Sequence, residues 1–251
     1  MKVQQALDDP DCHMDTAVKL VQAEPLLSAR VVSVANSAAF NRARREITDV
    51  RTSVLRLGLL TVRLLATALV ARQMAGEPAT QSDQNLAAQL WEHTAHVASI
   101  SRVIAQRVTN VDPETAMFAG IVHEIGGFYL LSRVQDFPGL LDDDYKDWIE
   151  VGEAEVGRAV LKVLAVPGPV VEAVEEYWFG YLEMPPRTLG DTLLLGDKLA
   201  PVSSPLHELG SRETRDDIKA IVELAIEDET LTGILEESSE EIKSLTAALR
   251  F

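Results

Sequence analysis

The stretch LAAQLWEHTAHVASISRVIAQRV, residues 86–108, decides the fold class of this chain. Leu90, Val97 and Ile104 recur within it at helical spacing, so the sequence predicts a long helix with one buried face. The polar segment AGEPATQSDQ, residues 75–84, comes just before it and contains both glycine and proline. Such a segment predicts a linker, and we expect a domain boundary there.

Helical periodicity continues on both sides of this stretch. Asp112-Pro113-Glu114 is a helix-start signature with proline at the first helical position, and Gly126-Gly127 is placed to end that helix. Gly58 is placed to break another helix, and no stretch of useful length alternates as a strand would. The sequence therefore predicts an all-α fold. Two further helices are expected to begin at a cap: one at Asp15, running to residue 23, and one at Thr48 or Asp49, running to residue 57. Others are expected over residues 26–36, 60–74, 153–164, 170–178 and 192–199, and a last one ends at Leu249.

The chain divides into three predicted parts. Residues 1–80 form an N-terminal helical subdomain, residues 81–205 a helical core, and residues 206–251 a set of acidic C-terminal helices. Ser238 and Glu241 fit a capping box at the start of the last helix.

Composition limits the class of protein. The 251 residues are 47% hydrophobic, which fits a globular protein. They include 23 basic and 39 acidic residues, and the net charge of −16 argues against nucleic acid or anionic lipid as a partner. Cys12 is the single cysteine, so an internal disulfide is excluded. The clean apolar run over residues 64–71 is too short for membrane insertion, and the N-terminus lacks a signal-peptide apolar region, so we expect a reduced, soluble, cytoplasmic protein.

Charge is unevenly distributed along the chain. Residues 26–75 contain eight arginines against Glu46 and Asp49, a balance of 8 − 2 = +6, so the remainder sums to −22. This basic block either docks on the acidic remainder of the chain, is simply solvated, or meets an acidic partner. Solvation or internal docking is the more common outcome for such a charge run.

Candidate metal ligands occur at three places. His93 and His96 are three residues apart on the predicted long helix, and both could face the same way. His123-Glu124 lies beside Gly126-Gly127, and Asp197 lies among apolar neighbours, where an unpaired carboxylate is unfavourable. Imidazoles and carboxylates together suit Mn, Fe or Zn.

Each of these residues also has a structural alternative. His96 could be an ordinary surface or core histidine, His123 could hydrogen-bond a carbonyl at its helix end, and Asp197 could pair with Lys198. No nucleophile arrangement competes, because Cys12 has only its neighbour His13 beside it. Gly-rich phosphate-binding motifs of the GxGxxG and Walker types are absent from the sequence.

Three segments together resemble the HDOD domain family. They are AEPLLSARVVSVANSAAF (23–40), ITDVRTSVLRLG (47–58), and LWEHTAHVA (90–98) followed by FAGIVHEIG (118–126). The resemblance covers about residues 16–200. It implies an N-terminal helical subdomain packed on a core like that of HD metal-dependent phosphohydrolases, and a regulatory role in bacterial signal transduction. Within the first segment, we expect Asn36 to satisfy neighbouring backbone groups.

The resemblance also implies a set of metal ligands. His93 falls at the first ligand position, His123 at the second and Asp197 at the distant one, while Glu124 replaces an aspartate. Glu153, Tyr177 and Trp178 stand where members with two metals often have histidines, and tyrosine and tryptophan are poor ligands for such metals. The second half of a two-metal clamp on phosphate is therefore expected to be missing.

We accordingly predict a non-catalytic HDOD signalling protein, a pseudoenzyme with no catalytic residues. His93, His123, Glu124 and Asp197 form a remnant pocket held by hydrogen bonds. No cofactor is expected, apart from one divalent metal that these four residues could still hold. The expected partners are signalling proteins such as a sensor kinase or a cyclic-dinucleotide enzyme.

Two alternatives remain at this stage. The first is a metal-dependent phosphohydrolase or cyclic-dinucleotide phosphodiesterase that uses the same four residues. The second is a scaffold that forms a homo-oligomer through its C-terminal helices.

Overall fold

The structure is a computed structural model. It describes residues 12–74, 81–134, 136, 148, 152–164, 166–179, 185–206, 233, 235–236 and 238–249. Every regular element in these ranges is a helix, so the predicted all-α fold is confirmed. Among the same residues, no helix is both long and apolar enough to cross a membrane.

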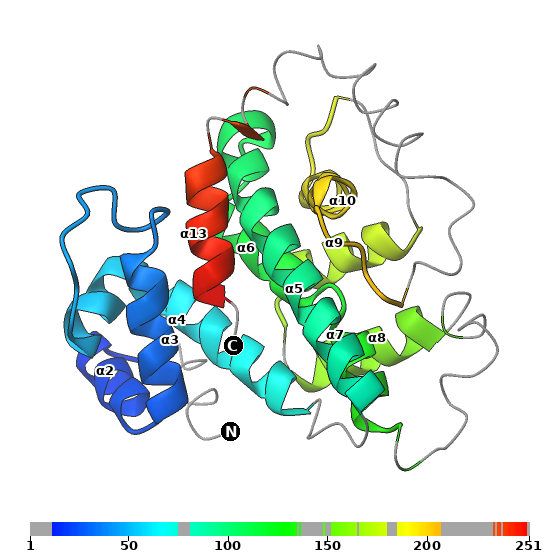
Figure 1. Ribbon diagram of the computed structural model, residues 1–251, viewed down its shortest axis with the longest axis horizontal. Coiled ribbons are helices and arrows are strands. Elements are labelled where there is room, and N and C mark those ends of the chain that lie inside the picture. Colours follow the sequence, from blue (N-terminus) through cyan, green and yellow to red (C-terminus); the bar gives the residue numbers. More distant parts are fainter. Residues whose placement is uncertain are drawn as a thin grey trace.

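The N-terminal helices pack together at one side of the molecule (Figure 1). They are α2 (Met14–Gln22), α3 (Pro25–Asn36) and α4 (Val50–Met74). Asp49 accepts a hydrogen bond from the backbone N–H of Thr52 at 2.8 Å, as expected of a helix cap. Gly58 interrupts α4 with φ of 78°, a left-handed conformation that glycine adopts easily, so the predicted break at this residue is confirmed.

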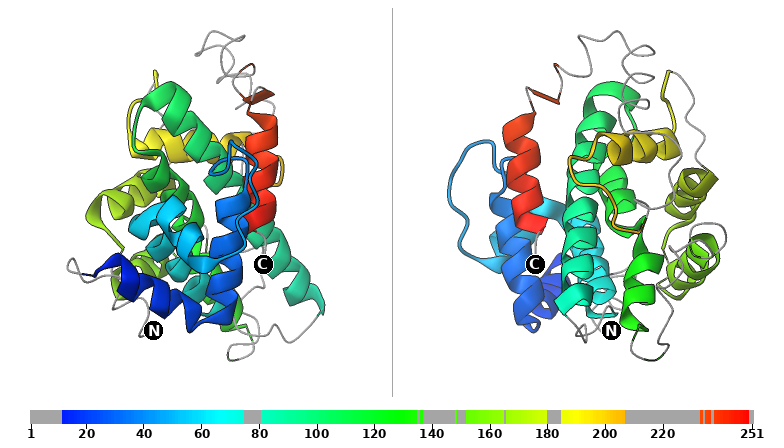
Figure 2. Two further views of the ribbon diagram at one scale, coloured as in Figure 1. Left: turned by 90° about the vertical axis from the view of Figure 1, so that its left-hand side faces the viewer. Right: turned by 45° about the vertical axis from the view of Figure 1, so that its right-hand side comes forward.

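The central helix is α5 (Gln81–Ile104), which continues into the π-helical turn η1 (Ala105–Thr109). It contacts α6 (Pro113–Val122), α10 (Leu189–Leu199) and α13 (Ser239–Leu249). Helices α7 (Ile125–Ser132), α8 (Glu153–Val163) and α9 (Gly168–Phe179) complete the far side (Figures 1 and 2). The C-terminal helix α13 lies between α3 and α5, so the last described segment closes the seam between the N-terminal helices and the core.

Several predicted helix limits are wrong. The helix that begins at Pro113 ends at Val122, and Gly126-Gly127 lies inside the next helix, α7. Close packing explains the difference, because a Cβ added at Gly126 would lie 3.0 Å from the backbone nitrogen of Gly157 on α8. These glycines permit a helix contact and do not end a helix.

The predicted helix starts differ in two further places. Helix α2 has His13 and not Asp15 at its N-cap, and Asp15 lies in the first turn, 2.8 Å from Arg51. Helix α5 begins at Gln81, inside the predicted linker, because Asp83 suits the first turn of a helix as well as it suits a loop. Residues 75–80 and the acidic segments 142–147 and 214–232 lie outside the described residues. The three-part division of the chain stays a prediction.

Candidate functional site

Three elements bring four of the predicted residues together. His93 comes from the middle of α5, His123 and Glu124 form the turn between α6 and α7, and Asp197 comes from α10. Helices α5 and α6 approach closely at Gly120, where the absence of a side chain makes room. A Cβ added there would lie 2.5 Å from the Cα of Ala98. This close approach carries His123 to the ring of His93. We call His93, His123, Glu124 and Asp197 the histidine–carboxylate cluster.

Backbone carbonyls orient the two imidazole rings of the cluster. The Nδ1 atom of His93 lies 2.8 Å from the carbonyl oxygen of Val202, and the Nδ1 atom of His123 lies 2.7 Å from that of Gly120. A carbonyl oxygen only accepts, so each ring carries a proton on Nδ1. The Nε2 atoms are then left to face each other, and they are 3.2 Å apart.

Two facing lone pairs at this distance repel each other unless a positive charge lies against them. The Nε2 atom of His93 is also 3.3 Å from Asp197 Oδ1 and 3.9 Å from Glu124 Oε1. The side chains of His93 and Glu124 are each 1% exposed and that of Asp197 is 11% exposed. In this setting either a proton or a metal ion balances the cluster.

The pKa shifts follow from the same contacts. Burial acts to lower the pKa of His93, but the hydrogen bond to Asp197 and the charges of Glu124 and Asp197 together raise it. Burial acts to raise the pKa of Asp197, whereas the hydrogen bond and charge of His93 hold it well below its usual range. Without a metal, these shifts favour a protonated His93 beside a charged Asp197 more than in the free side chains.

The donor set fits one divalent cation. His93, His123 and Glu124 each offer a ligand atom, and these atoms all lie within 4.8 Å of one another. Two ligand atoms bound to one tetrahedral Zn²⁺ at about 2.1 Å stand roughly 3.4 Å apart. The separations of His93 Nε2 from His123 Nε2 and from Asp197 Oδ1 are close to that value.

Tyr177 closes one side of the cluster. Its ring packs edge-on against His123, with the ring centroids 5.1 Å apart, and the residue is 7% exposed. Burial raises the pKa of the Tyr177 phenol well above its usual value, and the charges of Asp197, Glu124 and Glu153 raise it further. A neutral aromatic side chain thus stands beside the imidazoles.

The sequence identified the four cluster residues but missed the groups that orient them. The carbonyls of Val202 and Gly120 could not be predicted, because every residue has a backbone carbonyl and the sequence does not show which one will accept a hydrogen bond. His96 is partly buried and is not among the residues that converge with His93. The alternative partner considered for Asp197 is also present, because Lys198 Nζ lies 3.5 Å from its Oδ2.

Asn36 has the structural role that was expected of it. Its Nδ2 group donates to the carbonyls of Val32 at 3.0 Å and Ile47 at 2.7 Å, and its Oδ1 atom accepts from the N–H of Ile47 at 2.8 Å. The side chain therefore ties the end of α3 to the far end of the following loop.

Comparison with known proteins gives a family match over most of the chain. The sequence model of the HDOD domain matches residues 1–178. A curated relative, an uncharacterized protein of Treponema pallidum (strain Nichols), is 23% identical over 192 residues. That match covers 69% of this chain but 35% of the relative, so this chain spans about a third of the relative's length.

Solved structures with the same fold come from several bacteria. A protein of Shewanella amazonensis SB2B, described as a candidate metal-dependent phosphohydrolase, has a TM-score of 0.74 at 20% identity, with 99% of this chain and 89% of that chain covered. An HDOD domain protein of unknown function from Geobacter sulfurreducens has a TM-score of 0.66 at 20% identity with the same coverage. A candidate signal transduction protein of Marinobacter aquaeolei VT8 has a TM-score of 0.65 at 19% identity, with 99% of this chain and 59% of that chain covered. At these identities the likeness shows the fold.

Proposed function

Because the chain belongs to the HDOD family, we propose that it is a regulatory protein that works through protein–protein contacts and does not hydrolyse phosphate esters. The family match and the structural neighbours support a regulatory or HD-like role at the level of the family. Loss of catalysis and action through contacts are our own inferences from the residues of this chain.

Burial of the cluster is the observation that carries this proposal. His93 and His123 are each 1% exposed and Glu124 is 2% exposed, and the Tyr177 ring packs on His123. A hydrolytic metal centre needs an open position where water and a phosphate can reach the ion. The imidazoles have almost no surface open to solvent, and we infer that a phosphate ester does not reach them.

Two positions beside the cluster, where the family resemblance would place ligands for a second ion, hold aromatic residues in the described part of the chain. Tyr177 offers a neutral phenol, and the ring of Trp178 lies against Gly157, where an added Cβ would be 2.4 Å from Trp178 Cζ2. Arg158 lies over the same indole, 5.7 Å from the ring centroid. Trp178 is thus explained by packing between α8 and α9 and Tyr177 by packing on His123, and neither supplies a group for binding an ion.

The cluster retains a structural use. His93, His123, Glu124 and Asp197 would hold one divalent cation, which supplies positive charge where four donors converge. These residues join α5, the turn between α6 and α7, and α10, so their shared ion would fix three elements of the core in one arrangement. The helical core would then present surfaces of fixed shape to other proteins.

Exposed charge supports recognition by contact. Arg42, Arg44 and Arg45 are exposed in the loop between α3 and α4, in a chain whose net charge is −16. We expect a bacterial cytoplasmic partner such as a sensor kinase or a cyclic-dinucleotide enzyme, and self-association stays a further expectation. A local basic surface on an acidic protein favours one orientation of an acidic partner.

A metal-dependent phosphohydrolase is the competing function, and the convergence of His93, His123 and Glu124, with Asp197 beside His93, favours it. The two are separated by metal analysis together with turnover of bis(p-nitrophenyl) phosphate in the presence of Mn²⁺. We expect no turnover above the metal-only rate. Robust turnover that is abolished in His123→Ala but retained in the matched control His96→Ala would overturn the proposal.

A further inference from the structure

Solvent reaches the histidine–carboxylate cluster at one of its four members. His93, His123 and Glu124 are buried almost completely, whereas 11% of the Asp197 side chain is exposed. An ion that exchanges with solvent would therefore meet Asp197 first. The groups beside Asp197 decide how easily a cation enters or leaves the cluster.

The Asp197 carboxylate connects the interior of the cluster to the surface. Its Oδ1 atom lies 3.3 Å from Nε2 of the buried His93, and its Oδ2 atom lies 3.5 Å from Nζ of Lys198. The Lys198 side chain is 38% exposed. The two oxygens of one carboxylate thus face a candidate metal ligand on one side and an ammonium group in contact with water on the other.

The contact between Lys198 and Asp197 is not imposed by the helix that holds them both. Consecutive residues of an α-helix point about 100° apart, since each turn has about 3.6 residues, and their side chains do not normally face each other. The long side chain of Lys198 therefore turns back toward Asp197. At 3.5 Å, with the ammonium partly exposed, this pair is weak and easily released.

The charges of the cluster show what Lys198 balances. Asp197 and Glu124 together carry a charge of −2, which Lys198 offsets in part when no ion is bound. One divalent cation would balance the two carboxylates by itself, since 2 − 2 = 0, and the charge of Lys198 would then be in excess. Lys198 and a metal ion are alternative counter-charges for the same carboxylate.

We propose that Lys198 competes with a divalent metal ion for Asp197 and thereby weakens the cation site. Its ammonium group holds the Asp197 carboxylate when no ion is bound, and its positive charge opposes an ion at the exposed side of the cluster. This inference rests on the single ion proposed above for the four cluster residues. Lys198 is not a ligand in this arrangement; it is a positioning residue that acts through Asp197.

The consequence is a site whose occupancy depends on metal concentration. By opposing the ion, Lys198 raises the concentration of free metal at which α5, α10 and the turn after α6 become joined. A site that is filled at every metal concentration could not report a change in that concentration. A weakened site therefore suits a regulatory protein.

Titration of the full chain with Mn²⁺ by isothermal titration calorimetry at low ionic strength tests the proposal. Lys198→Gln removes the charge and keeps much of the side chain, and we expect it to bind Mn²⁺ about tenfold more tightly than the parent protein. Lys198→Arg keeps the charge and should bind as the parent does. At about 1 M KCl the difference between Lys198→Gln and the parent should fall below about threefold, because salt then screens exposed charges within a few ångströms.

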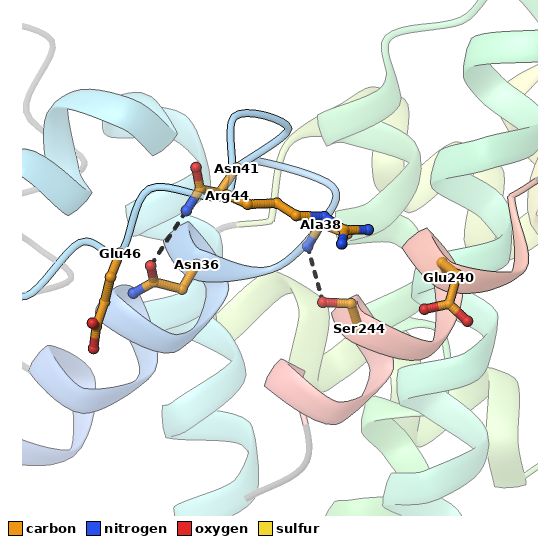
Figure 3. Close-up of a pocket in the computed structure, with 7 residues that line it drawn as sticks. All are labelled: Asn36, Ala38, Asn41, Arg44, Glu46, Glu240 and Ser244. Atoms are coloured by element: carbon orange, nitrogen blue, oxygen red, sulfur yellow. Dashed lines mark hydrogen bonds between the residues drawn. The ribbon is translucent and has the colours of Figure 1, made fainter.

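Lys243 provides a matched control on a different helix. It belongs to α13, is 73% exposed and lies 4.0 Å from Glu240, so it also pairs with a carboxylate at the surface. Glu240 and Glu46 line a pocket between α13 and the loop after α3, which is formed by residues other than those of the cluster (Figure 3). Lys243→Gln should leave the affinity for Mn²⁺ unchanged, whereas His93→Ala should abolish the gain of Lys198→Gln. Circular dichroism confirms that each variant is folded.

The outcomes separate this inference from the proposed function. Equal affinities of Lys198→Gln and the parent, equal gains in Lys198→Gln and Lys198→Arg, or an equal gain in Lys243→Gln would each overturn the role of Lys198. If neither the parent nor Lys198→Gln binds Mn²⁺ at millimolar concentration, the ion and the competition for Asp197 are both refuted. Phosphodiester turnover is measured independently, so the proposal of a non-hydrolytic regulatory protein would stand.

Discussion

Two groups of buried charged side chains are built on α5, and they are balanced in different ways. In the first, which we call the Arg102 junction, Arg102 pairs with Glu114 at 3.0 Å and with Glu241 at 2.5 Å and lies over the ring of Phe40. The second is the histidine–carboxylate cluster. The junction joins α5, α6, α13 and the loop after α3, whereas the cluster joins α5, α10 and the turn after α6.

The difference is whether the chain supplies its own counter-charge. The side chain of Arg102 is 6% exposed and both of its carboxylate partners come from this chain. Burial still raises the pKa of Glu114, although Arg102 opposes that shift, so desolvation is only partly compensated even in a complete pair. The cluster instead combines two imidazole lone pairs with two carboxylates, and its balance requires a proton or a metal ion from outside.

Removal of the charge at the centre of the junction has the largest expected effect. In Arg102→Met the side chain keeps its bulk, but Glu114 and Glu241 lose their partner while half-buried. We expect the free energy of unfolding to fall by about 3–5 kcal/mol, as is usual when one member of a buried pair is removed. Urea denaturation followed by circular dichroism measures the change. A fall below about 1 kcal/mol would show that the carboxylates reach solvent and that the junction is not closed.

Addition of a metal tests the incomplete cluster. If its donors hold one ion, Mn²⁺ or Zn²⁺ at a hundred times its dissociation constant should stabilise the protein by about 2.7 kcal/mol, and a chelator should reverse the gain. The melting temperature with and without metal measures this effect. His93→Ala should lose the response and His96→Ala should keep it. Equal responses in these two variants would place the ion elsewhere on the protein.

Apolar spacing was sufficient for the fold class, whereas residue types gave a wider set of candidates that included His96, and the resemblance to the HDOD family implied the four cluster residues. Apolar periodicity predicted α5, and an aspartate among apolar residues predicted that Asp197 would have a partner. Gly126-Gly127 was misjudged, since a glycine that ends a helix and one that admits a neighbouring helix look the same in one dimension. The Arg102 junction could not be predicted either, because Glu241 is 139 residues from Arg102 and only the docking of α13 brings them together.

A smaller change separates the contribution of Glu241 to the stability of the junction from that of Glu114. Glu241→Gln removes the charge that α13 contributes but leaves Arg102 paired with Glu114, so we expect a loss of about 1–2 kcal/mol, near the value of one charge-assisted hydrogen bond. Hydrogen exchange should accelerate in α13 and not in α6. Equal acceleration in both helices would mean that the whole junction opens together, and that α13 does not detach on its own.

The smallest expected effect comes from an arginine with as many contacts as Arg102 but without its burial. Arg158 lies 2.8 Å from Glu175, 3.4 Å from Glu155 and over the Trp178 ring, yet 43% of its side chain is exposed. Water and salt already screen these charges, so Arg158→Met should leave the urea midpoint unchanged within error, while the methionine still covers the indole. Arg102→Met and Arg158→Met make the same chemical change at arginines with equally many contacts. The difference between their effects on stability therefore reports the burial of the charge and not the number of contacts. A midpoint shift in Arg158→Met as large as that in Arg102→Met would mean that contacts, and not burial, set the stability of both regions.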